Sequence, residues 1–128
     1  MSKPVNINDA HRVAFIFLYF ATETDNKLAT EELMVISDKI EDYITDEYKT
    51  KTQLNSWQVV TETLNWYTGL SSENKKNTFS KLILSLKRNF TESQKKYLIK
   101  DLNILADSDG EFLDTEKKLI QKSLELLN

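Results

Sequence analysis

Two stretches of the sequence, one near each end, repeat one another when the chain is shifted by 84 positions. This shift places Asp25 on Asp109 and Glu32 on Glu116. In both copies an apolar segment is followed by an acidic turn and then by apolar positions three or four apart, the spacing of an amphipathic helix. The sequence therefore predicts an all-α fold with two related helix-turn-helix halves. The other matched pairs are Glu23 and Asp107, Asn26 and Gly110, Leu28 and Phe112, Thr30 and Asp114, Val35 and Leu119, Ile36 and Ile120, Ile40 and Leu124, and Glu41 and Glu125.

Helical spacing also accounts for most of the sequence between the two copies. The chain has only two glycines and one proline, so it lacks the turn residues that hairpins between strands require. Ser71 or Ser72 is a suitable cap for one helix, and Thr91 begins a capping box with Gln94 at the start of the next. We expect a single domain over residues 1–128, built as a bundle of about six to seven helices.

The first helix, expected over residues 8–22, has hardly a polar break in its second half. A helix that is apolar on most sides is covered on most sides, so this is the predicted core helix. The helix that contains Trp57 and Trp66 is apolar on two faces and is also expected to lie centrally, although one of the two indoles is available for a groove or a dimer contact. The polar stretch 46–56 is predicted to be a loop or a frayed turn. The buried positions expected in the last helix are Ile120, Leu124 and Leu127.

Charge is segregated along the chain, although the net charge is only −3. Residues 1–50 carry five Lys/Arg against ten Asp/Glu, residues 73–100 eight against two, and residues 101–128 three against seven. We interpret this as basic helices packing beside acidic ones, because nucleic-acid binding needs an open basic surface and the whole chain is acidic.

There is no cysteine, which excludes disulfides and thiolate metal sites. No segment has the length and composition of a signal peptide or a membrane span, so we expect a cytoplasmic protein without membrane insertion.

The acidic residues of the two turns have a sufficient structural explanation. Asn26 and Gly110 occupy matching positions and are the residue types that most easily adopt the left-handed conformation of a sharp turn. Thr30 and Asp114 are good N-cap residues for the helices that follow. The two matched glutamates then lie in the first turn of a helix, where the helix dipole favours negative charge.

A divalent-cation site is a competing interpretation of the same turns. Measured against the calcium-binding helix-loop-helix pattern, each turn has acids at loop positions three, five and twelve. Position one, which is normally Asp, is Ala21 in the first copy and Leu105 in the second, so neither turn is a true EF-hand. Calcium takes about six to eight oxygen ligands, so a cation would need carboxylates from both turns. A third interpretation, a surface that docks a protein, stays open beside these two.

The motif Asp109-Gly110-Glu111-Phe112 followed by Glu116, with a weaker copy at Asp25-Asn26-Lys27-Leu28 and Glu32, resembles the TerB-like domains associated with bacterial tellurite resistance and stress responses. The resemblance covers nearly the whole chain. It implies a wholly helical domain with two related halves and an acidic cluster for a divalent cation such as Ca²⁺, Mg²⁺ or Mn²⁺. Lys27 stands where Glu111 stands in the second copy, so the second turn is closer to the family pattern. The metal ligands that the resemblance implies are Asp25, Glu32, Asp107, Asp109, Glu111 and Glu116.

These features favour a non-enzymatic binding or scaffold domain whose partners are other proteins rather than nucleic acid. The alternative is a structural or regulatory protein-interaction domain that binds no metal. His11 is the single histidine, and its place near the start of the first helix predicts a surface or helix-start residue rather than a ligand or a base. Without a second histidine, a cysteine or a serine in a glycine-rich turn, no nucleophile and base can be assigned, so we do not expect an enzyme. The sequence predicts no oligomeric state.

Overall fold

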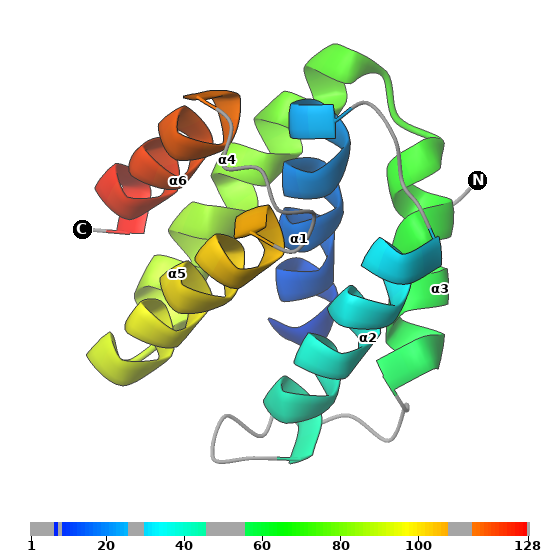
Figure 1. Cartoon of the computed structure of the whole chain (residues 1–128), viewed down its shortest axis with the longest axis horizontal. Coiled ribbons are helices and arrows are strands. Elements are labelled where there is room, and N and C mark those ends of the chain that lie inside the picture. Colours follow the sequence, from blue (N-terminus) through cyan, green and yellow to red (C-terminus); the bar gives the residue numbers. More distant parts are fainter. Residues whose placement is uncertain (1–6, 8, 26–29, 46–55, 108–113, 128) are drawn as a thin grey trace.

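The structure, a computed structural model, describes residue 7 and the ranges 9–25, 30–45, 56–107 and 114–127. Within them, the side chains of residues 9, 23–25, 30–32, 42–45, 106–107 and 114–116 are not described. The described residues form six helices and no strand, arranged in a single bundle (Figure 1), so the predicted all-α fold class is confirmed. The helices are α1 (Asp9–Asp25), α2 (Thr30–Thr45), α3 (Ser56–Thr68), α4 (Ser72–Asn89), α5 (Glu92–Asp107) and α6 (Asp114–Leu127).

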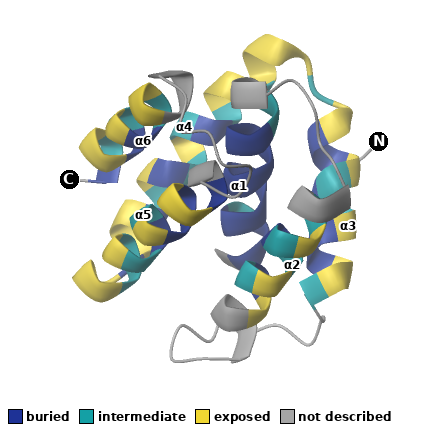
Figure 2. Ribbon diagram, viewed as in Figure 1, coloured by how far each residue is buried: buried dark blue, intermediate teal, exposed yellow. Residues whose placement is uncertain are grey.

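Helix α1 lies at the centre of the bundle and contacts each of the other five helices (Figure 1). Residues 13–21 are all buried, and the most exposed of them, Tyr19, is only 6 % exposed. Figure 2 shows the same helix buried along most of its length while its neighbours expose their outer faces. The prediction of a core helix from its unbroken apolar run is therefore confirmed. Thr22, the next residue, satisfies its hydroxyl within the helix by donating to the Leu18 carbonyl at 2.9 Å.

Side-chain caps fix the starts of α4 and α5. The Asn74 amide donates to Ser71 Oγ at 3.2 Å, which makes Ser71 the N-cap of α4. At the start of α5 the Thr91 amide donates to Gln94 Oε1 at 2.8 Å, and the Gln94 amide donates to Thr91 Oγ1 at 3.2 Å. This reciprocal pair is the predicted capping box. Because only Phe90 and Thr91 separate α4 from α5, these caps also determine where the chain changes direction.

Helix α3 packs against α1 and α2 at one edge of the bundle rather than at its centre (Figure 1). The prediction of a central position was wrong, because only one face of the helix is fully covered. Trp66 is 6 % exposed and its ring lies 4.7 Å, centroid to centroid, from that of Phe15. Trp57, in contrast, is 53 % exposed. Of the two indoles, Trp57 is thus the one that stays available at the surface.

The helix pairs α1–α2 and α5–α6 correspond to the two copies in the sequence. Their second helices, α2 and α6, begin at the matched residues Thr30 and Asp114. These residues were predicted as N-caps, which would place the first helical residue one position later, a difference within the usual uncertainty of a helix boundary. Helix α5 contacts both α1 and α2, while α6 contacts α1. The two pairs therefore pack against one another, with α3 covering the first pair and α4 packed on α1 and α6.

Candidate functional site

The acidic residues predicted as metal ligands fall at the ends of the paired helices. Asp25 is the last residue of α1, and Asp107 is the last residue of α5. Glu32 and Glu116 lie in the first turns of α2 and α6, as the capping interpretation requires. The side chains of these four lie outside the described part of the structure, so their grouping around a cation stays a prediction. The remaining two predicted ligands, which lie outside the described residues altogether, are Asp109 and Glu111.

No metal-binding cluster is present among the side chains that the structure describes. No three His, Cys, Asp or Glu side chains in this part of the chain are placed where they could hold an ion together. Two buried ionisable side chains in this part, His11 and Asp101, each pair with a side chain on another helix.

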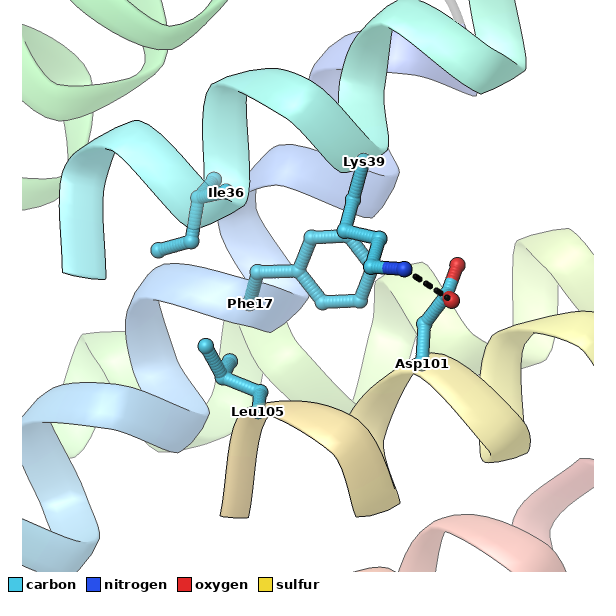
Figure 3. A pocket seen from close by; sticks show the side chains of 5 residues that line it. All are labelled: Phe17, Ile36, Lys39, Asp101 and Leu105. Atoms are coloured by element: carbon cyan, nitrogen blue, oxygen red, sulfur yellow. Dashed lines mark ion pairs between the residues drawn. The ribbon is translucent and has the colours of Figure 1, made fainter. Parts of the chain in front are cut away.

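One ion pair joins the two copies of the repeat, from Lys39 on α2 to Asp101 on α5 (Figure 3). Lys39 Nζ lies 3.4 Å from Asp101 Oδ1, and the side chains are 23 % and 1 % exposed. The apolar side chains around the pair leave no room for a water molecule. The pair therefore fastens one half of the fold to the other and offers no space for a ligand. The surrounding residues are Phe17, Ile36 and Leu105.

Sequence reasoning missed Asp101, although its position carries a signal. It lies three residues after Leu98 and four before Leu105, both of which are buried, so it shares their face of α5. The shift of 84 positions also places Phe17 on Asp101, so two residues that line the space drawn in Figure 3 come from matching positions of the repeat. A charged residue on a buried face predicts a partner on another helix.

His11 forms a second polar link, between α1 and α3. Its imidazole is wholly buried, and Nε2 donates to Glu62 Oε1 at 2.8 Å. Of the two predicted alternatives, a surface residue or a helix-start residue, the structure shows the second, with the side chain buried in the first turn of α1. The reason is that α3 packs over this end of α1 and supplies a carboxylate that is itself 44 % exposed.

A groove between α5 and α6 contains a cavity of about 230 Å³. Its apolar lining consists of Ile99 from α5 together with Leu124 and Leu127 from α6. Leu127 is 1 % exposed and belongs to the core, whereas Leu124 is 36 % exposed. The predicted burial of Leu124 is therefore wrong, because no described helix covers this side of the pair.

Charged residues from the first two turns of α5 form the rim of the groove. Lys95 Nζ lies 3.0 Å from Glu92 Oε1, and the Lys96 side chain is exposed. Two cations and one anion give this rim a net positive charge. The groove thus combines an open apolar wall with lysine side chains at its edge.

The basic residues of the middle of the chain face mainly outward. Basic helix α4 does pack beside α6, which belongs to the acidic C-terminal stretch. Of the eight basic side chains between residues 73 and 100, however, six are exposed and only Lys75 and Lys95 are half-buried. Lys75 lies over the ring of Tyr67, with Nζ 4.6 Å from the ring centroid. The six exposed residues are Lys76, Lys81, Lys87, Arg88, Lys96 and Lys100.

Comparison with known proteins adds no assignment to this geometry. No protein-family model matches the chain, and no curated protein or solved structure is similar enough to count as a match. The TerB-like resemblance therefore stays a prediction based on the acidic motifs. Within the described residues, no helix combines the length and the apolar character needed to cross a membrane.

Proposed function

We propose that this chain is a non-enzymatic binding domain of the TerB-like type that docks a partner protein in the α5–α6 groove. The observation that carries the proposal is the exposed Leu124, which stands beside half-buried Ile99 at a cavity of about 230 Å³. Binding energy at protein interfaces is concentrated where a few side chains fill such a pocket. Sites for drug-sized ligands usually occupy about 300–1,000 Å³, so this cavity better suits one or two side chains of a protein.

The buried polar residues support a binding role rather than catalysis. The imidazole of His11 is used to join α1 to α3, through Glu62. The carboxylate of Asp101 is used to join α5 to α2, in packing too tight for a water molecule. A general acid or base has to reach a substrate, directly or through one water molecule. Both groups are instead employed in holding helices together.

The proposed function is tested by isolating the protein from its native cells under gentle conditions and identifying what accompanies it. We expect a stoichiometric partner with the natural sequence and loss of that partner with Leu124→Glu. Leu84→Glu is the matched control, because Leu84 is a 45 % exposed leucine on α4, away from the groove lining. A partner that stays bound to Leu124→Glu, or the lack of any partner, would overturn the proposal.

The acidic turns support a second candidate function, a weak divalent-cation site formed by both turns together. Support comes from the repeated acidic motif and from its place at the ends of the matched helices α1 and α5, whose last residues are Asp25 and Asp107. Calorimetric titration with Ca²⁺, Mg²⁺ and Mn²⁺, with tryptophan emission recorded in parallel, tests this site. We expect binding that is lost in Asp109→Asn combined with Glu116→Gln. No response at about 10 mM metal, well above the range of extracellular calcium modules, refutes it.

A further inference from the structure

In the first helix pair, α3 covers a face that the second pair leaves open. Three contacts hold α3 there: a polar contact at its first residue, a polar contact near its middle and an aromatic contact near its C-terminal end. His11 and Phe15, which contact α3, and Ile40, on the neighbouring helix α2, are all 0 % exposed. The three contacts are His11 Nε2 to Glu62 Oε1 at 2.8 Å, the ring of Phe15 to that of Trp66 at 4.7 Å between centroids, and Ser37 Oγ to Ser56 Oγ at 3.2 Å.

The 84-residue shift maps this covered face onto the α5–α6 groove. Phe15 corresponds to Ile99, and Ile40 corresponds to Leu124, so the apolar character is kept at both positions. The equivalents, however, are half-buried Ile99 and 36 % exposed Leu124. In the described part of the chain, the second pair has no helix in the place that α3 occupies on the first. The polar equivalents on the same face are Lys95 for His11 and Gln121 for Ser37.

We propose that the groove docks a single acidic amphipathic helix of a partner protein, in the way that α3 docks on α1 and α2. This inference rests on the proposed function and names the kind of partner. In α3, Glu62 reaches His11, and Trp66, four positions later, packs on Phe15. A partner helix in the same register places a carboxylate at the lysine rim and a large apolar side chain, one turn later, in the cavity.

Charge and packing favour such a partner over a second copy of this chain. Lys95 stands where His11 stands in the first pair, and exposed Lys96 lies next to it, so an acidic helix is the complementary one. In α3, which carries the required pattern, Trp66 and Tyr67 are 6 % and 2 % exposed. The same spacing occurs in α5 and α6, where Leu105 and Ile120 are 7 % and 9 % exposed. A folded second copy cannot release them without opening its own core.

The test is selection of a phage-displayed library of amphipathic helical peptides on the full chain, followed by fluorescence-polarisation titration of the enriched peptides. We expect these peptides to carry Asp or Glu four or five positions before a large apolar residue. Leu124→Glu should weaken their binding by about tenfold or more, a loss equivalent to at least about 1.4 kcal/mol. Lys96→Glu should weaken them as well because it removes a positive charge from the rim, while Leu84→Glu should leave binding unchanged. Circular dichroism and thermal unfolding establish that each variant is folded.

Three results would overturn the inference. Enriched peptides that are basic or non-helical, but still sensitive to Leu124→Glu, would contradict the acidic helix and leave a groove-binding function intact. The lack of any Leu124-sensitive peptide with a Kd below about 100 μM would contradict helix docking, while the native partner experiment would still decide the proposed function separately. A dimer in sedimentation equilibrium that Leu124→Glu dissociates would show that a second copy fills the groove.

Discussion

The ion pair between Lys39 and Asp101 allows a quantitative prediction, because removing one charge should cost more than removing both. At the observed 3.4 Å, and with an effective dielectric constant of about 20, the attraction is about 5 kcal/mol. Ordering the lysine side chain costs about 2 kcal/mol, and its 23 % exposure weakens the pair further, which leaves a coupling of about 2–3 kcal/mol. We expect Lys39→Met to lower the free energy of unfolding by about 3 kcal/mol, since it removes a positive charge that is paired with a buried carboxylate. Lys39→Met combined with Asp101→Leu should cost only about 1 kcal/mol, because the neighbours of the pair are apolar.

The assay is equilibrium unfolding in urea, followed by circular dichroism, for the natural sequence, the two single variants and the double variant. The coupling free energy then follows from the double-mutant cycle. Lys95→Met is a control, since its partner Glu92 is 80 % exposed and exposed pairs contribute at most about 1 kcal/mol. A coupling below about 0.5 kcal/mol between Lys39 and Asp101 would refute the view that the pair fastens the two halves together.

Three further substitutions test separate parts of the fold by the same unfolding assay. Thr91→Ala removes one half of the capping box and should cost about 1 kcal/mol, whereas an unchanged midpoint would mean that α5 does not depend on this cap. Phe15→Ala empties a wholly buried ring position and should cost about 3–5 kcal/mol; a loss below about 1 kcal/mol would contradict the central role of α1. Glu62→Ala removes a hydrogen-bond partner of the buried His11 imidazole and should cost about 1–2 kcal/mol, while Glu62→Gln, which keeps an acceptor, should cost less.

The elements that the sequence predicted well depend on local signals. The central position of α1 follows from its own unbroken apolar run, because apolar side chains on all sides of a helix are buried only when other helices surround it. The start of α5 follows from four consecutive residues, whose capping box forms as expected between Thr91 and Gln94. The repeat predicted that α2 and α6 begin at matching positions, and they do. The first two of these signals lie within a few helical turns, and the third comes from comparing two segments 84 positions apart.

The positions that the sequence predicted wrongly depend on which helix covers which. Leu124 has the spacing of a core residue, but its side of α6 has no described helix over it. His11 stands in the first turn of α1, and the contact that its buried side chain makes with α3, about fifty positions away, is not visible in the local sequence. Helix α3 has two apolar faces, which predicts a central position. The sequence of the helix does not reveal how many other helices are available to cover those faces, and α3 packs against α1 and α2 at the edge of the bundle. The six predicted metal ligands remain a prediction, since the structure describes none of their side chains.

The central place of α1 also affects how the chain reaches its fold. Helix α1 is synthesised before every helix that covers it, and its contacts with α5 and α6 close loops of more than sixty residues. Contacts of such sequence separation slow folding, even in a purely helical protein. The most apolar segment of the chain therefore emerges from the ribosome long before its last partners do, and in that interval it is the part most exposed to aggregation and to chaperones.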